Sequence, residues 1–393
     1  MVRIRPSFLT RFAAVIAVFL ASTIPSLSQA APVGTPVLAN ACGQVTVPTT
    51  PLIKPLHNEP LHANDGQIPT TVVAGNLGGH PSAVTFGPDG TLYVAITYSE
   101  TYPLSYYASL YGRVYAVKDG VTSLMVDGLH NPTGLTFLGD SLYIATLDRI
   151  VRVSGVSGAS CTAIEPIIDN LPFDESHWTN GVTAHDGRIY AITGYVYRPL
   201  GSSRRDLRGT VWSFAPDGSD IRIEATGFRN SYALTFDPSG EMWASDNAPN
   251  AGYDPGVTDE KQVYPDDLNH IVPGKDYGFH PESGAIVTAV GAYAATPVTA
   301  KICITQDCGT PPVLSLGMHS APTGIVWSEA RGQILVGLSS WGQVVAYDPT
   351  ETEPVAVIWN LNVPSGMTIG PDGNLYIAEW SANRVIMVPI PAS

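Results

Sequence analysis

Residues 81–95 read PSAVTFGPDGTLYVA, and a close copy returns at residues 364–379 as PSGMTIGPDGNLYIAE. Each copy consists of an alternating apolar run, a Pro-Asp-Gly turn and a second alternating run. The turn residues supply the backbone angles of a tight reversal, and the alternation gives each strand one buried face. The stretch therefore predicts a β-hairpin, and its return predicts a repeat.

Four further copies of this hairpin lie between the first and the last. They read PTGLTFLGDSLYIA at 132–145, TNGVTAHDGRIYAI at 179–192, NSYALTFDPSGEMWAS at 230–245 and PTGIVWSEARGQILVG at 322–337. An apolar strand precedes each hairpin, and a strand of the type Gly-x-Val-x-x-Val follows it. Four antiparallel strands at a period of roughly 40 to 50 residues are typical of a propeller blade. We expect an all-β, six-bladed β-propeller of four-stranded antiparallel blades, with an unrelated β-sandwich as the alternative.

The two ends of the repeat region predict how the ring closes. The region begins with a single strand at Thr70–Gly75 and finishes on a third strand at 383–389. The N-terminal strand can therefore become the outer strand of the sixth blade and leave no free edge. We expect a propeller over 70–393, insertions around 250–265 and 279–312, and a Pro-rich N-terminal arm at 31–69.

The first thirty residues have the pattern of a secretory signal peptide. Three arginines precede the apolar run FAAVIAVFLA at 12–21, and Ser28-Gln29-Ala30 supplies a small-residue cleavage site. The run is short for a membrane span, although an uncleaved anchor is the alternative. The pattern predicts a periplasmic or secreted protein with a signal peptide at 1–30 and no membrane span after its cleavage.

Charge and cysteine content narrow the classes of function. The formal net charge is −14, and cleavage after residue 30 would remove three arginines and no acidic residue. So acidic a chain repels phosphate backbones, which argues against nucleic-acid binding. Four cysteines in an exported chain are typical of two disulfides. Three connectivities are possible; the short loop favours Cys303–Cys308, which leaves Cys42–Cys161.

The residues just before each hairpin are the candidates for a binding site. In a propeller they gather at one end of the central channel, where ligands usually bind. They include His80, His130, His177, Arg229 and His319, in a chain with only nine histidines.

Three stretches resemble the soluble PQQ-dependent glucose/sorbosone dehydrogenase-like family, whose members are six-bladed propellers that bind pyrroloquinoline quinone (PQQ) with calcium. The first is GFRNSYALTFDPSGEMWASDNAPN at 227–250, followed by DDLNHIVPGKDYGF at 266–279. The second is SHWTNGVTAHDGRIYAITG at 176–194, and the third is HSAPTGIVW at 319–327. The resemblance covers blades three to five well, and the other blades only as generic propeller.

The resemblance implies an exported quinoprotein-type sugar dehydrogenase, acting on an aldose or a sorbosone-like sugar with an external electron acceptor. His177 would be the general base, for which an imidazole suits because its pKa lies near the working pH. Arg229 and Asn230 would bind the quinone, and the backbone oxygens of Ala248 and Pro249 would be calcium ligands.

The sequence departs from the family where the carboxylates of PQQ are normally bound. Family members supply lysine and arginine there from blades five and six, but residues 337–345 and 363–366 contain neither. Lys275, Lys301 or a loop arginine would have to substitute.

Two other functions remain open from the sequence. One is a calcium-dependent lactonase or strictosidine-synthase-like hydrolase, in which Asn131, Asn180, Asn230 and Asp246 would supply oxygen ligands. The other is a non-catalytic propeller that binds glycan or protein. Its candidate surface is the tyrosine-rich loop YSETYPLSYYASLY at 98–111.

Overall fold

A computed structural model describes residues 62–63, 66–97, 112–174, 177–197, 204–248, 265–280, 285–286, 310–351 and 353–390. These residues form strands and two short 3-10 helices, η2 (Arg205–Leu207) and η4 (Trp380–Ala382). The signal peptide, most of the N-terminal arm, most of both insertions and the tyrosine-rich loop lie outside the described residues.

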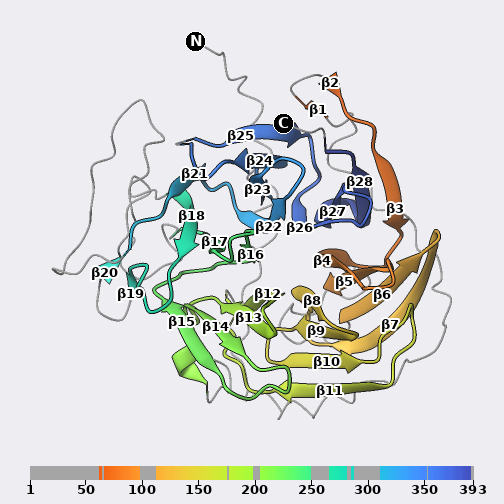
Figure 1. Ribbon diagram of the computed structural model, residues 1–393, viewed down its shortest axis with the longest axis horizontal. Coiled ribbons are helices and arrows are strands. Elements are labelled where there is room, and N and C mark those ends of the chain that lie inside the picture. The colour runs from red at the N-terminus through yellow and green to blue at the C-terminus, as the bar shows by residue number, and fades with distance from the viewer. Residues whose placement is uncertain are drawn as a thin grey trace, which may run out of the picture. The chain divides into compact units, whose positions relative to one another are not determined.

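The strands form six four-stranded antiparallel units, which confirms the predicted fold class (Figure 1). Blade one contains β4 (His80–Phe86), β5 (Leu92–Thr97), β6 (Gly112–Lys118) and β7 (Val121–Leu129). Blade two contains β8 (Gly134–Leu138), β9 (Ser141–Ala145), β10 (Ile150–Ser154) and β11 (Ala163–Ile168). Blade three contains β12 (Thr179–His185), β13 (Arg188–Thr193), β14 (Thr210–Phe214) and β15 (Arg222–Thr226).

The other three blades follow the same order. Blade four contains β16 (Leu234–Phe236), β17 (Met242–Asp246), β18 (Pro265–Ile271) and β21 (Leu314–Met318). Blade five contains β22 (Pro322–Ser328), β23 (Gln333–Leu338), β24 (Gln343–Tyr347) and β25 (Val355–Trp359). Blade six contains β26 (Pro364–Ile369), β27 (Leu375–Glu379), β28 (Arg384–Val388) and the N-terminal strand β3 (Thr71–Gly75).

The ring closes as the sequence predicts. β3 pairs antiparallel with β28, so the first strand of the repeat region completes the last blade. The innermost strands contact one another in the cyclic order β4, β8, β12, β16, β22, β26 and back to β4 (Figure 1). No blade is therefore left without a neighbour on either side.

The hydrophobic core is divided among the six interfaces between blades. Each of six buried clusters draws its side chains from two adjacent blades, such as Tyr93 of blade one with Ile144 of blade two. Each sheet buries both faces against its neighbours, so central strands such as β5 and β14 are buried along their whole length instead of alternating.

Hydrogen bonds near the channel tie each blade to the next, from the innermost segment in five blades and from Ser245 of β17 in blade four. The pairs are Ser82 Oγ to Pro132 O, Thr133 Oγ1 to Thr179 O, Asn180 Nδ2 to Ser231 O, Ser245 Oγ to Pro322 O, Thr323 Oγ1 to Pro364 O and Ser365 Oγ to Pro81 O. Equivalent positions thus meet around the ring, so all six innermost strands run in the same direction. The residues that precede them share one end of the channel, which we call the channel mouth.

Two small additions extend the repeat. β1 (His62–Ala63) and β2 (Gly66–Gln67) form a hairpin that pairs with Trp359 at the outer edge of blade five. β19 (Phe279–His280) and β20 (Ala285–Ile286) form a second short hairpin after β18.

Candidate functional site

Five of the residues expected at the channel mouth are held there by packing, namely His130, Asn131, His177, Arg229 and Asn230. All five are buried, whereas His80 is half-buried and His319 is exposed. His80 stacks on Trp380 with 4.7 Å between ring centroids, and His130 Nδ1 lies 3.4 Å from Asp148 Oδ1. These contacts give His80 and His130 structural roles in blades one and two.

His177 is the most deeply placed of the candidate catalytic groups, with 1% of its surface exposed. It directly precedes the innermost segment of blade three. Its Nδ1 lies 2.5 Å from the carbonyl oxygen of Tyr195, which follows β13. A carbonyl can only accept, so Nδ1 carries the hydrogen and the Nε2 of a neutral imidazole is then the basic nitrogen.

His177, Arg229 and Asn230 come together at Gly194. A Cβ on Gly194 would lie 2.8 Å from Asn230 Oδ1, 3.1 Å from His177 Cβ and 3.4 Å from Arg229 O. Only a residue without a side chain lets blades three and four approach this closely. The structure therefore joins three residues that lie on two different hairpins of the sequence.

Arg229 and Asn230 are fixed by the carboxylate at the end of β17. Their backbone N–H groups donate to the two oxygens of Asp246, at 3.0 Å for Arg229 and 2.8 Å for Asn230. The Arg229 guanidinium donates from Nη1 to the carbonyl oxygen of Asn247 at 3.2 Å. Asp246 thus holds the segment that carries both candidate cofactor ligands.

Amide and phenol groups continue the site into the channel. Asn180 Nδ2 donates to Asn230 Oδ1 at 3.1 Å. Tyr232 lines the channel at the place where the other blades have Ser, Thr or Asn. Burial raises the pKa of Tyr232, against the smaller lowering effects of a hydrogen bond with Asn230 and of the Arg229 charge.

Three carboxylates of blade four lie close together beside this segment. Burial raises the pKa of Asp246 from 3.8 to about 6, although the N–H groups of Arg229 and Asn230 counteract it. Burial also raises the pKa of Asp266. The pKa of Asp267 is raised well above 3.8, first by burial and then by repulsion from Asp246 and Asp266.

Some buried oxygens of this region have no hydrogen-bond partner within the part of the chain that the structure describes. They are Asp267 Oδ1, Asn247 Oδ1 and Asn180 Oδ1. A buried acceptor without a donor is costly unless a cation, a water molecule or a bound ligand completes it. The described ranges contain no group of three or more His, Cys, Asp and Glu side chains arranged to hold a metal. Any cation here would therefore need backbone or amide oxygens as well.

Ala248 is buried, and its N–H donates to Asp266 Oδ1 at 2.8 Å. Asp266 Oδ2 accepts from Ser320 Oγ at 3.1 Å and from the N–H of Ala321 at 2.8 Å. Asp266 therefore ties the candidate metal-binding backbone to the start of blade five. Pro249 lies outside the described residues.

Two of the described basic residues, Arg384 and Lys275, do not replace the cations that blades five and six lack. Arg384 of blade six pairs with Glu379, whose side chain is fully buried and also accepts from Asn362. Lys275 is exposed at the outer edge of blade three, where its carbonyl accepts from the N–H of Thr226. Lys301 lies outside the described residues. Arg208 lies 5.3 Å from the centroid of the Tyr195 ring, on the segment that contacts His177, so Arg229 and Arg208 are the cations that the described residues place on this side of the mouth.

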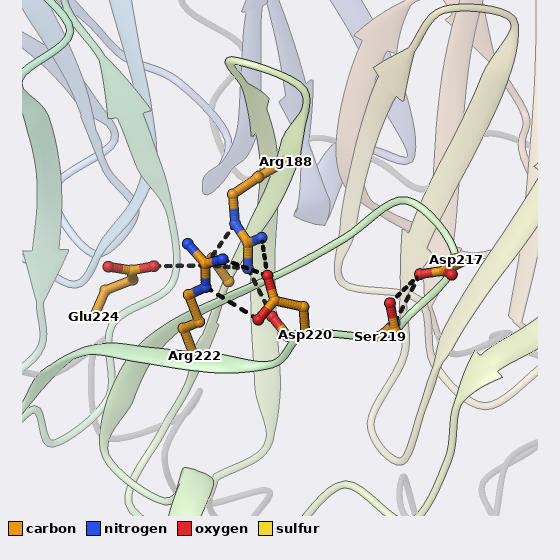
Figure 2. Close-up of polar contacts among 7 residues, drawn as sticks. Arg188, Asp217, Ser219, Asp220, Arg222 and Glu224 are labelled. Carbon is orange, nitrogen blue, oxygen red and sulfur yellow. Dashed lines mark hydrogen bonds and ion pairs between the residues drawn. The ribbon is translucent and has the colours of Figure 1, made fainter.

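The arginines on the outer part of blade three lie at the end of the sheet opposite the channel mouth. Figure 2 shows Arg188 and Arg222 converging on Asp220. Arg188 Nη1 lies 2.8 Å from Asp220 Oδ2, and Arg188 also contacts Ser213, which donates to Glu224. These charges are matched locally and lie far along the strands from His177.

Below the site, the six innermost strands line a cavity of about 160 Å³. One position of the strand is threonine in five blades, namely Thr85, Thr136, Thr183, Thr235 and Thr368, and is Val326 in blade five. The cavity under the mouth is therefore lined by hydroxyl groups together with apolar and glycine residues.

Sequence reasoning missed Asp266, Asp267 and Glu379 as parts of the mouth. Their signal in the sequence is an acidic residue at the end of the second strand or the start of the third, where most blades have Ser, Thr or an apolar residue.

Cys161 is disulfide-bonded, and the other three cysteines lie outside the described residues. The connectivity therefore stays a prediction. Among the described residues, no helix is long and apolar enough to cross a membrane.

Comparisons with known proteins give a matching family model, a curated relative and solved structures of similar fold. Residues 59–309 match the family model "Domain of unknown function (DUF7133)". An uncharacterized protein of Borreliella burgdorferi is 24% identical over 260 residues, which are 62% of this chain and 61% of that protein. The chain thus spans about three fifths of the length of this curated relative.

Two solved structures have a similar fold. The PQQ-bound aldose sugar dehydrogenase of Streptomyces coelicolor is 20% identical, with a TM-score of 0.55, over 85% of this chain and 99% of that one. The PQQ domain of pyranose dehydrogenase from Coprinopsis cinerea, in its holo form, is 14% identical, with a TM-score of 0.60, over 86% of this chain and 98% of that one. The resemblance to PQQ-dependent sugar dehydrogenases seen in the sequence is confirmed at the level of the fold.

Proposed function

The chain belongs to the DUF7133 family, and from this premise and the geometry of the channel mouth we propose that it is an exported quinoprotein-type sugar dehydrogenase. The substrate would be an aldose or sorbosone-like sugar, the cofactors PQQ and calcium, and the final oxidant an external electron acceptor. The observation that carries the proposal is the convergence of His177, Arg229 and Asn230 around Gly194. The fold of the chain is similar to that of a PQQ-bound aldose sugar dehydrogenase and of the PQQ domain of a pyranose dehydrogenase.

The groups of blades three and four fit a quinone with acidic substituents. Arg229 supplies a fixed positive charge, and Asn230 and Asn180 supply amides whose positions are set by their neighbours. A charge held in place before the reaction stabilises negative charge as it develops, at no cost of reorganisation. Arg229 alone does not balance three carboxylates, and a bound divalent cation would add positive charge beside it.

The oxygens beside Ala248 fit a calcium ion. Calcium prefers oxygen ligands, including carboxylates, amides and backbone carbonyls. Asp267 Oδ1 and Asn247 Oδ1 are buried acceptors without a hydrogen-bond partner among the described residues. With the carbonyl oxygens of Ala248 and Pro249, they would offer the mixed donor set that calcium takes.

Bound PQQ would supply a two-electron acceptor for the hydride that leaves the anomeric carbon of the sugar. His177 would take the proton of the anomeric hydroxyl on Nε2, because Nδ1 donates to Tyr195 O and keeps Nε2 unprotonated in the neutral ring. Burial of His177 limits the access of water to this nitrogen. The sugar would lose one hydride and one proton in total and leave as a lactone.

The geometry gives less support to the hydrolase alternative. Asp246 already accepts hydrogen bonds on both carboxylate oxygens, and Asn230 Oδ1 accepts from Asn180 Nδ2. Two of the four residues that would bind a channel calcium therefore already accept hydrogen bonds within the protein on their side-chain oxygens.

Dye-linked oxidation of a panel of sugars, after reconstitution with PQQ and calcium, tests the proposal. His177→Asn keeps a side-chain N–H toward Tyr195 but removes the base, and we expect kcat to fall by about 10²- to 10⁴-fold. His185→Asn is the matched control, because His185 ends the same strand at the opposite end and stacks on Phe236. Absence of turnover on every sugar in the panel, with lactone hydrolysis or glycan binding instead, would overturn the proposal.

A further inference from the structure

Asp174 bridges the two segments that determine where the His177 imidazole lies. Its carboxylate accepts from the N–H of His177 on Oδ1 at 2.9 Å and from the N–H of Tyr197 on Oδ2 at 2.7 Å. The Asp174 N–H in turn donates to the carbonyl oxygen of His177 at 2.9 Å. Asp174 is buried, with 5% of its surface exposed. One carboxylate thus holds the loop before β12 and the loop after β13 together.

The bridged segments carry the donor and the acceptor of one hydrogen bond. His177 provides the imidazole, and Tyr195, two residues before Tyr197, provides the carbonyl that meets Nδ1. The rings of His177 and Tyr197 lie 5.8 Å apart. Asp174 fixes the backbone on both sides of the contact between His177 Nδ1 and the carbonyl of Tyr195. This contact therefore depends on both carboxylate oxygens of Asp174 accepting hydrogen bonds.

The position of Tyr195 is further fixed from blade four and from the loop before β14. Its N–H donates to Arg229 O at 2.6 Å. Arg208 lies over the Tyr195 ring, 5.3 Å from its centroid, and donates to Val196 O at 3.2 Å. Tyr195 therefore has anchors that do not involve Asp174, whereas the described contacts of the His177 backbone run to Asp174.

We infer that Asp174 is a positioning residue that sets the tautomer and orientation of His177 by clamping its backbone to the segment of Tyr195. The inference deepens the proposed function, because the Nδ1–H tautomer leaves Nε2 as the base. Hydrogen bonds to an ionised carboxylate are stronger than neutral ones, which suits a clamp of two N–H groups. Asp174 itself touches no reacting atom.

Asp174→Asn tests the clamp, since an amide keeps the size but turns one acceptor oxygen into a donor that faces a backbone N–H. Long-range ¹H–¹⁵N correlation spectra of labelled protein report which nitrogen of His177 carries the hydrogen, with the signal assigned by its loss in His177→Gln. We expect wild-type protein to show the Nδ1–H form, and Asp174→Asn to show a mixture or the Nε2–H form. In the reconstituted enzyme kcat should fall on the order of 100-fold, with KM little changed.

Asp237→Asn is the control for stability alone. Asp237 accepts from the N–H groups of Ser239 and Glu241 in the hairpin turn of blade four, away from the channel mouth. An unchanged His177 tautomer in Asp174→Asn, with a loss of stability like that of Asp237→Asn, would overturn the inference. If Asp174→Asn does not fold, Asp174→Ser, which leaves one acceptor oxygen in place of two, is measured in the same way, and an unchanged tautomer there overturns it equally. The tautomer is read without turnover, so this result is separate from the test of the dehydrogenase activity.

Discussion

Ser365 of the last blade donates a hydrogen bond from Oγ to the carbonyl oxygen of Pro81 in the first blade, at 2.6 Å. The two residues are 284 positions apart in the chain, yet they lie at successive positions of the repeat, Pro81 first and Ser365 second in their copies. The same bond recurs from blade one to two and from blade five to six. The ring is therefore closed beside the channel by side chains as well as at its outer edge by β3.

Ser365→Ala should lower the free energy of unfolding by about 1 to 2 kcal/mol. The substitution removes a buried hydroxyl and leaves the carbonyl of Pro81 without this donor, and such a loss typically costs that much. Urea unfolding followed by tryptophan fluorescence, with the disulfides kept intact, measures the change.

Ser219→Ala is the control for this prediction, because Ser219 is exposed and bonds only locally to Asp217 (Figure 2). We expect it to change stability by less than about 0.5 kcal/mol. Equal effects of the two substitutions would show that the contact between blades six and one adds nothing to ring closure.

The turn of the first hairpin makes stability depend on pH through Asp89. Burial alone would raise the pKa of Asp89, but hydrogen bonds from Thr91, Lys118 and the N–H of Gly158 outweigh it and lower the pKa to about 2. The pKa in the folded protein is thus below the ordinary value of 3.8. Stabilisation by the ionised carboxylate is complete above about pH 4 and is lost as the pH falls toward 2.

Asp89→Asn should therefore destabilise the protein by about 1 kcal/mol at pH 7, and the difference from wild type should shrink between pH 4 and pH 2. Urea midpoints at a series of pH values measure it. Asp119→Asn is the control, since Asp119 is exposed at another turn of the same blade with a positive φ that Asn also tolerates. A difference that stays constant down to pH 2 would contradict the role of the Asp89 charge.

Much of the fold could be predicted because the repeat is local. Six alternating runs with Gly-containing turns define six hairpins, and the lone strand β3 at the start explains closure. The hairpin of β1 and β2 on blade five could not be predicted, since two-residue strands have no periodicity. Their pairing depends on an edge that only the assembled blade provides.

The candidate site could be predicted only in part for a related reason. Repeat position placed His177, Arg229 and Asn230 at one end of the channel, but their meeting at Gly194 depends on the distance between two blades. Nor does a sequence show whether Glu379, at the end of β27, faces solvent or a neighbouring N–H group. Its full burial against Asn362 and Arg384 is a tertiary property.

Calcium should raise the melting temperature of the wild-type protein, and Asp266→Asn should reduce the increase. Asp266 holds the N–H of Ala248, so its loss would release the backbone that carries a proposed calcium ligand. A ligand present at about 100 times its Kd stabilises a protein by about 2.7 kcal/mol, which corresponds to several degrees. Thermal scans with calcium, with magnesium and with chelator measure it.

Asp217→Asn serves as the acidic control, because Asp217 is exposed at the end of blade three away from the mouth (Figure 2). It should keep the full calcium effect. A calcium-dependent increase of the same size in Asp266→Asn, or none in the wild type, would refute this placement of the metal.

The account depends above all on whether the channel mouth holds the quinone through Arg229. The most direct measurement is the absorbance of the protein titrated with PQQ in the presence of calcium, compared between the wild type and Arg229→Gln. We predict a saturable bound-quinone spectrum for the wild type, and an affinity at least about 10-fold weaker for Arg229→Gln, as loss of a charge-assisted contact implies. No spectral change with the wild type, or equal binding by both proteins, would contradict the account.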